Sequence, residues 1–434
     1  MKCLKLLFAF AFAITMSLST TSCGGDDDGD NKKPGTETGG DQGGGNQTGG
    51  ELTESGKKEY IDATARELVD YINVDDFRPI TDLGHYVRED LTRSANRSSK
   101  TDIIEDFFDD AIDLCTDITN PASIVRMFLM IRFSAEFSYQ NGTWVRTGTP
   151  TNTLRFNFTD KNGQPCVAEA VGSGKEVEVH ASIFDDSHKV YNYRDNTYYN
   201  QIEENRFKVP EQVNVKLTQG NNVLASIQVN INVNTTNGEF KYNANNVSAT
   251  MNANIVGYNI VLSRAYYNGG SNAGVDLSVS KNNVMLVKAN VTANVRFDED
   301  GEFVSAGNGN VNVDILGKVQ VKGTLDDFNK IRDLDNKITR ESTESEVKDI
   351  ANQMNKQFNI GVYFNNGSTR QAYLQVYPFL EKKSYYERWK VEPVICFGDG
   401  TSYSTFESLG DDSRFNELTK KIEKLVTDFE NLVK

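Results

Sequence analysis

Apolar and polar residues alternate at every second position from Met127 to about residue 325, and this period constrains the fold more than any other feature. A period of two places successive side chains on opposite faces of a β-strand. Clear examples are Leu154, Phe156 and Phe158, then Val177, Val179 and Ala181, then Val213, Val215 and Leu217. The alternation therefore predicts a long succession of strands, each with one face in a hydrophobic core.

Turn signals separate these strands at regular intervals. They are Asn141-Gly142, Asn162-Gly163, Gly220-Asn221, Asn237-Gly238 and Asp300-Gly301. Asn-Gly and Asp-Gly pairs adopt the positive φ angles of tight hairpin turns, so consecutive strands are expected to pair antiparallel. The sequence therefore predicts one large meandering sheet.

Two stretches of the alternating region, about 213–268 and 275–327, look alike. Asn221-Asn222-Val223-Leu224 and Asn237-Gly238-Glu239-Phe240 flank a long strand in the first stretch. Asn282-Asn283-Val284-Met285 and Asp300-Gly301-Glu302-Phe303 flank one in the second. Duplication of a four-strand unit and chance similarity between hairpins with the same turn residues both explain the pattern. In either case the two units would extend one sheet.

Helical spacing of apolar residues flanks the alternating region on both sides. It covers 57–72, 79–91, 101–118 and 344–358, and it returns from about Ser413 to the end of the chain. The last segment carries an apolar stripe made of Phe415, Leu418, Ile422, Leu425, Phe429 and Leu432. This stripe fits packing across the protein's own sheet or a coiled-coil seam with a second copy. The weak repetition of the flanking charges favours the first.

Together these patterns predict an α+β fold in which a large antiparallel β-sheet packs against N- and C-terminal helices. Residues 51–125 would form an N-terminal helical segment, and 126–330 the antiparallel β region. Residues 331–434 would add a helix, strands around 372–377 and 391–397, and the C-terminal amphipathic helix, completing the same domain.

The first 22 residues predict export from the cytoplasm. Lys2 and Lys5 precede an apolar run from Leu6 to Leu18, and small polar residues follow it. A cationic start, a short apolar centre and a small-residue end are typical of a signal peptide, and this apolar run is too short to span a bilayer. Residues 1–22 are therefore interpreted as a signal peptide.

Thr21-Ser22-Cys23, at the end of that segment, resembles the lipobox of bacterial lipoproteins, although Thr20 departs from the usual aliphatic residue. The resemblance implies cleavage before Cys23 and lipidation of Cys23, with palmitate among the acyl chains. Gly24-Gly25-Asp26-Asp27-Asp28-Gly29-Asp30 is similar to the surface-export signal of Bacteroidetes lipoproteins. This implies an outer-membrane lipoprotein that faces the cell exterior. The alternatives are a secreted protein with a free Cys23 and an anchored protein that faces the periplasm.

The segment 23–50 is expected to be a disordered tether. Residues 24–50 include eleven glycines, and Pro34 is their only apolar residue, so the segment cannot bury enough surface to offset its ordering entropy. Loss of Lys2 and Lys5 with the signal peptide changes the formal net charge from −15 to −17. So acidic a body repels nucleic acid, which excludes nucleic acid as an electrostatic partner.

Three further segments carry a resemblance to a family. They are Lys57-Lys58-Glu59-Tyr60-Ile61 with Asp75-Asp76-Phe77, then Val209-Pro210-Glu211-Gln212-Val213, and Pro393-Val394-Ile395 with Asp399-Gly400-Thr401-Ser402-Tyr403. All three look like segments of uncharacterised surface lipoproteins of Bacteroidetes, from which no activity and no catalytic residue follow. The expected architecture also resembles the half-barrel of lipoprotein carriers, a fold that shelters acyl chains.

The sequence contains no motif that predicts catalysis, a metal site or a cofactor. His85, His180 and His188 lack metal-ligand spacing, and Asp185-Asp186-Ser187-His188 is interpreted as a solvated loop. Gly172-Ser173-Gly174-Lys175-Glu176 lacks the first glycine and the hydroxyl of a phosphate-binding loop, and it is interpreted as a turn between strands. Asp298-Glu299-Asp300-Gly301 lacks the bidentate acid of a calcium loop and is interpreted as a hairpin turn.

Three cysteines and two aromatic clusters are the remaining candidates. Cys115, Cys166 and Cys396 are expected to be buried free thiols, with one disulfide among them left open. The clusters Tyr191, Tyr193, Tyr198 and Tyr199, and Tyr385, Tyr386 and Trp389, could stack on sugar rings. Cross-strand packing is the favoured role for such residues in strands.

These observations lead to three functional hypotheses. The first is non-catalytic binding of an extracellular ligand, either a glycan or a protein, by a protein anchored to the outer membrane through Cys23. The second is a carrier of lipid or another hydrophobe on a concave, half-barrel-like sheet. The third is an unrecognised hydrolase, whose carboxylates cannot be selected from 61 acidic residues.

Overall fold

The computed structural model describes the chain from Leu52 to Val433 with several gaps. The described residues are 52–80, 134–141, 143–160, 162–192, 197–238, 240–299, 303–383, 386–397, 403–405 and 415–433. For 143, 178–192, 197–208, 303, 383, 403–405, 429–430 and 432–433 the backbone alone is described. The expected signal peptide, Cys23, the expected tether and the helix expected over 101–118 lie outside the described residues. Of the helix expected over 79–91, only residues 79–80 are described, and they are helical.

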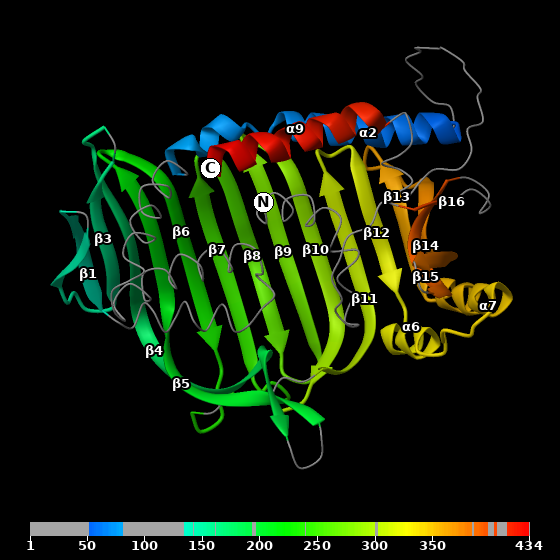
Figure 1. Cartoon of the computed structure of the whole chain (residues 1–434), viewed down its shortest axis with the longest axis horizontal. Helices are drawn as coiled ribbons and strands as arrows, with labels where there is room; N and C mark the ends of the chain where they lie inside the picture. Colours follow the sequence, from blue (N-terminus) through cyan, green and yellow to red (C-terminus); the bar gives the residue numbers. More distant parts are fainter. Residues whose placement is uncertain are drawn as a thin grey trace.

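The strands form one continuous open sheet (Figure 1). The sixteen strands described run in chain order from β16 back to β3, followed by β1 and then β2 at the far edge. Neighbouring strands pair antiparallel, except that β1 and β3 pair parallel. The alternation predicted a large, mostly antiparallel sheet with a few helices, and the structure confirms it.

The strand bounds follow the predicted alternation and turn signals. They are β1 (Ala135–Gln140), β2 (Thr143–Gly148), β3 (Thr153–Thr159), β4 (Pro165–Asn192), β5 (Thr197–Gln219), β6 (Asn222–Val233), β7 (Asn246–Ile255), β8 (Tyr258–Asn268), β9 (Asn272–Lys281), β10 (Val284–Phe297), β11 (Phe303–Ile315), β12 (Val319–Leu325), β13 (Phe358–Phe364), β14 (Arg370–Lys383), β15 (Tyr386–Phe397) and β16 (Tyr403–Thr405). The two similar stretches of sequence fall on part of β5 with β6–β8, and on β9–β12. Asn141, Asn237 and Asn282 take φ angles of 51°, 56° and 52° at their turns, as tight turns require.

The two faces of the sheet differ in chemistry. On one face, Val287 and Ala289 of β10 and Val311 and Val313 of β11 are buried in the largest hydrophobic cluster, together with Ile360 of β13. Their sequence neighbours point to the opposite face, because side chains alternate along a strand. The opposite face of β5–β14 is called the polar face below.

Five described helical segments accompany the sheet: α2 (Glu54–Asp70), η1 (Val74–Phe77), α6 (Phe328–Asp335), α7 (Glu344–Asn355) and α9 (Asn416–Val433). Helix α2 begins where the Thr53 side chain accepts a hydrogen bond from the Gly56 N–H, an N-cap. In Figure 1, α2 and α9 run together across one end of the central strands. Leu68 of α2 packs with Tyr258 of β8, and Leu425 of α9 packs with Val69.

Three details differ from the sequence-based expectations. Gly172–Glu176 was expected to be a turn between strands, and this is wrong: the segment is a β-bulge inside β4, because β4 and β5 continue to pair on both sides of it. The helix expected over 344–358 ends earlier, since Phe358 begins β13. Helix α6 and the parallel pairing of β1 with β3 were not predicted. Strands β10 and β11, on either side of 298–301, pair antiparallel, as the hairpin interpretation of this segment expects, but residues 300–302 lie outside the described residues.

Candidate functional site

Amide side chains occupy the polar face in rows that cross the strands. One row joins Asn214, Gln228 and Asn252 at matching register positions on β5, β6 and β7. A second row crosses four strands in register. Its members, from β9 to β12, are Asp276, Asn290, Asn312 and Lys322. Neighbouring strands lie about 4.8 Å apart, so each row repeats hydrogen-bonding groups at that spacing.

The amides are linked to one another by side-chain hydrogen bonds. Ser173 Oγ donates to Gln212 Oε1 at 3.2 Å, and Gln212 Nε2 donates to Asn230 Oδ1 at 2.9 Å. The chain continues on β7, where Asn230 Nδ2 donates to Thr250 Oγ1 at 3.2 Å. Each amide carries two donors and one acceptor oxygen, so these bonds orient the side chains without using all of their capacity.

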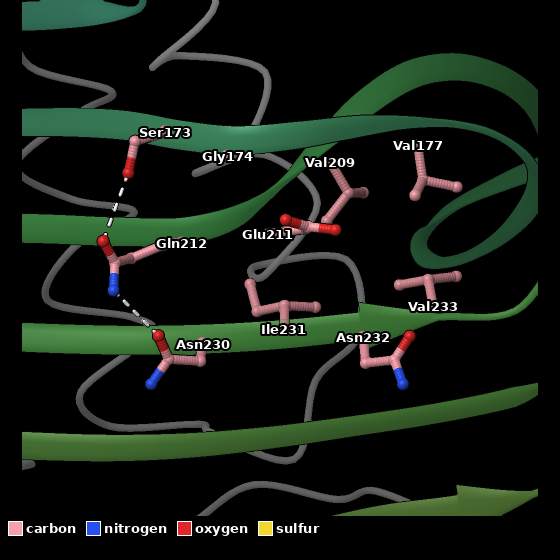
Figure 2. Close-up of a pocket in the computed structure, with 10 residues that line it drawn as sticks. All are labelled: Ser173, Gly174, Val177, Val209, Glu211, Gln212, Asn230, Ile231, Asn232 and Val233. Carbon is pink, nitrogen blue, oxygen red and sulfur yellow. Dashed lines mark hydrogen bonds between the residues drawn. The ribbon is translucent and has the colours of Figure 1, made fainter.

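A hollow of about 440 Å³ lies where β5 and β6 separate. Pairing of these strands ends at Gln212 and Asn230, and beyond that point 209–211 and 231–233 are not paired with each other. Figure 2 shows Ser173, Gln212 and Asn230 connected across three strands at one side of the hollow. Val177, Val209, Ile231 and Val233 supply its apolar part.

The bulge in β4 shapes this hollow. Gly174 has a φ of 84°, and a Cβ there would lie 2.9 Å from both Cβ and Oε2 of Glu211. The Lys175 N–H donates to Glu211 Oε2 at 3.0 Å, which holds the carboxylate against the bulge. Pro210, next to Glu211, has no N–H to donate to a neighbouring strand. The bulge and this proline coincide with the point where β5 and β6 separate.

A second hollow of about 500 Å³ lies over β5–β8. Its polar lining is Asn214, Lys216, Ser226, Gln228, Asn252, Asn254 and Asn259. Asn254 Nδ2 donates to Asn259 Oδ1 at 2.7 Å, so amides are paired across the β7–β8 turn here as well. Both hollows are therefore lined by groups that form hydrogen bonds with hydroxyls.

Aromatic rings lie on the same side of β14 at the other end of the polar face. Tyr373, Tyr377 and Phe379 are 38%, 38% and 40% exposed, which is high for side chains of this size. The Lys390 ammonium lies 5.8 Å from the centre of the Phe379 ring, within cation–π range. Exposed rings beside polar groups are typical of binding surfaces.

Glu381 anchors the distal end of this aromatic strip. It accepts hydrogen bonds from Arg388 Nε at 2.6 Å, Tyr386 Oη at 3.1 Å and Lys390 Nζ at 3.2 Å. Burial raises the pKa of Glu381, but the bonds from Arg388 and Lys390 outweigh it and lower the pKa to about 2. Tyr386 is thus engaged in a cross-strand cluster, which favours its structural role.

We expect Glu381→Gln to reduce the free energy of unfolding by about 2 kcal/mol at pH 6. A depressed carboxyl pKa contributes stability above the unfolded value of about 4.3, and this is lost as the pH falls toward 2. The difference between variant and parent should therefore shrink over that window. Urea unfolding at pH 6, 4 and 2.5 measures it, and a difference that stays constant with pH would contradict the assignment.

Most of the other residues singled out by the sequence lie outside the described part of the chain, wholly or with their side chains. Cys166 and Cys396 are buried, as expected, and burial raises the pKa of the Cys166 thiol. Cys23, Cys115, His85, Tyr193 and Tyr385 lie outside the described residues. For His180, His188, Tyr191, Tyr198 and Tyr199 the side chains lie outside them too. Trp389 pairs with Leu380 in the β14–β15 register.

The polar face was not among the sites predicted from the sequence. The alternation predicted only that each strand has one face in a hydrophobic core. The type of polar residue could have revealed this face from the sequence. Amides stand where charged residues are more usual, at Gln228, Asn230 and Asn232 on β6 and at Asn308, Asn310 and Asn312 on β11. The register that aligns them across strands is visible only in the fold.

Within the described ranges, the structure groups no three His, Cys, Asp or Glu residues in a way that could hold a metal ion. None of the helices described is long and apolar enough to cross a membrane. Comparison of the chain with protein-family models, with curated proteins and with solved structures gives no match.

Proposed function

We propose that this protein is a non-catalytic glycan-binding lipoprotein, held on the outside of the outer membrane by a lipid on Cys23. The observation that supports a glycan over a protein ligand is the polar face itself. Its amides and hydroxyls match sugar hydroxyls as donors and acceptors, and exposed rings on β14 offer stacking surfaces. Protein interfaces depend more on a buried apolar centre.

The proposed binding surface extends across many strands, so it could hold an extended ligand. Its amide rows cross β5–β7 and β9–β12, and the second hollow lies over β5–β8. A chain of sugar rings could lie along such rows and engage several amides at once. Affinity would then come from many moderate contacts, each contributing about 0.5–1.5 kcal/mol as a neutral hydrogen bond.

Binding to polysaccharides tests this proposal. The full chain, purified from membranes in detergent, should be retarded in gels that contain at least one of a panel of neutral and acidic polysaccharides. We expect Asn252→Ala with Asn254→Ala to weaken binding about tenfold, because both amides line the second hollow. Asn431→Ala, an exposed amide on α9, is the matched control and should leave binding unchanged.

Two results would overturn the proposal. One is the absence of retardation by every polysaccharide in the panel. The other is release of new reducing ends by the pure protein, abolished by one carboxylate substitution, which would indicate a hydrolase. The intact mass of the protein purified from its native host tests the anchor separately, since an unmodified Cys23 thiol would contradict lipidation.

The carrier hypothesis is the second candidate. The sheet is open, and the apolar side chains Val215, Val229, Ile231 and Val233 of β5 and β6 are half-buried around the buried Val213. We propose this as the surface that a half-barrel-like sheet would offer to acyl chains. Native mass spectrometry of the detergent-free protein should then find co-purified lipid, and its absence would reject this candidate.

A further inference from the structure

Two cations meet above Gly361 on the polar face, and neither has a carboxylate partner in the described part of the chain. Lys322 of β12 lies directly opposite Gly361 of β13. The Arg370 side chain of β14 also lies over this residue, since a Cβ at Gly361 would be only 2.6 Å from Arg370 Nε. Glycine at this position leaves the space that the Arg370 side chain occupies.

Tyrosine rings hold both cations in place. The Lys322 ammonium lies 4.3 Å from the centre of the Tyr363 ring, and the Arg370 guanidinium carbon lies 4.8 Å from that of Tyr373. Arg370 Nε donates to Tyr363 Oη at 3.2 Å. Cation–π contacts and this hydrogen bond fix the two groups without neutralising their charge.

Each cation keeps donors for a ligand. Arg370 Nη2 donates to Asn359 Oδ1 at 2.7 Å, and Lys322 Nζ donates to the Gly367 carbonyl at 3.3 Å. The Arg370 Nη1 group takes part in neither of the Arg370 bonds, and an ammonium has three donors. Asp314 on β11 lies two positions from Asn312, the residue opposite Lys322, and its oxygens accept from Gln320 Nε2 and the Gly317 N–H.

We propose that Lys322 and Arg370 bind the acidic group of the ligand, and that the protein is therefore selective for acidic glycans, whose sugars bear carboxylate or sulfate groups. This rests on the proposed glycan-binding function and specifies its ligand class. A planar guanidinium pairs with carboxylate or sulfate oxygens through two parallel hydrogen bonds. The exposed Tyr373 ring beside it would stack on the sugar that carries the acid.

The uncompensated charge also fits the composition of the chain. The mature chain has a formal net charge of −17 without Lys2 and Lys5, and it would repel a polyanionic glycan over most of its surface. Two cations at one place on the polar face would offset that repulsion locally and orient the glycan there. Binding through such a pair weakens as salt concentration rises.

Polymers with the same sugar backbone, with and without acidic groups, provide the test. The probes are polygalacturonate with its methyl ester, and dextran sulfate with dextran, each titrated into the full chain in detergent. We expect at least one acidic polymer to bind about tenfold or more tightly than its neutral form. Arg370→Gln and Lys322→Gln should each remove most of that preference, and Arg370→Lys should retain part of it.

Arg264→Gln is the matched control. The Arg264 guanidinium carbon lies on the same face, 3.8 Å from the centre of the Tyr266 ring, but this residue stands opposite an acidic residue, Asp276, in the β8–β9 register. The Arg264→Gln variant should keep the preference for the acidic polymer over its neutral form. Equal affinity for charged and neutral polymers, equal loss in Arg264→Gln, or full displacement by inorganic sulfate at the same anion concentration would overturn the inference. Binding to neutral polysaccharides alone would overturn it and leave the proposed function standing, whereas binding to none would remove both.

Discussion

Gly323→Ala is expected to destabilise the protein by at least about 3 kcal/mol, a large effect for the addition of a single methyl group. Gly323 lies in β12 with a φ of 152°, and a Cβ there would lie 2.0 Å from the Asn359 carbonyl oxygen and 2.6 Å from the Ile360 Cα. These are backbone atoms of the paired strand β13, so no side-chain rotation can relieve the overlap. The two strands would have to separate where they pair.

Gly307→Ala is the matched control for this prediction. Gly307 lies in β11, and its nearest neighbour would be the Asn294 Cβ at 3.4 Å, an ordinary contact. We expect the control to change the free energy of unfolding by less than about 1 kcal/mol. Urea unfolding of both full-chain variants, followed by circular dichroism, measures the difference. Equal midpoints for the two variants would contradict the close approach of β12 and β13.

The sheet could be predicted because its signals are local. Alternation defines each strand, and the pairs Asn141-Gly142 and Asn162-Gly163 each fix a reversal, so strand order follows from chain order. The pairing of β1 with β3 breaks this rule, because β2 folds back to the outside and leaves β1 beside a later strand. No turn residue encodes that choice. Phe156 of β3 is 1% exposed and packs against Phe137 of β1 and Trp144 of β2, and no single strand encodes these contacts.

The candidate site could not be predicted in the same way. The bulge at Gly174 depends on the Glu211 side chain of the partner strand, 37 residues later in the chain. Likewise, Arg370 is distinguished by lying over Gly361 between two tyrosines, which only the β13–β14 register brings together. A single strand shows that a position is polar. The partner strands decide whether its group is already paired or still has donors for a ligand.

Lys281→Met is expected to cost about 2–4 kcal/mol, because it removes the centre of the polar cluster that ties η1 to the sheet. Lys281 Nζ donates to the Tyr71 carbonyl at 3.0 Å and to Tyr258 Oη at 2.9 Å, and it also pairs with Asp76. The Asn73 N–H donates to the same tyrosine oxygen at 3.2 Å. Methionine keeps the volume of the side chain but leaves the partly buried Asp76 carboxylate without its cation.

The pH dependence separates this charge effect from a packing effect. Burial lowers the pKa of Lys281, but hydrogen bonds with Asp76 and Tyr258 outweigh it and raise that pKa above its usual value. A raised lysine pKa contributes stability below the unfolded value of about 10.4, and this is lost as the pH rises through the folded value. The difference between Lys281→Met and the parent should therefore persist at pH 7 and narrow in strong alkali.

Lys382→Met provides the matched comparison, since its ion pair with Glu387 at 3.2 Å is 64% and 59% exposed and should contribute less than about 1 kcal/mol. If both lysine variants unfold at the same urea concentration, the cluster does not hold η1 on the sheet. If Lys281→Met alone is destabilised, adding Asp76→Asn should recover part of the loss, because the carboxylate left without a cation is then gone. The segment that leads from α2 is thus expected to be attached through one lysine rather than through apolar packing alone.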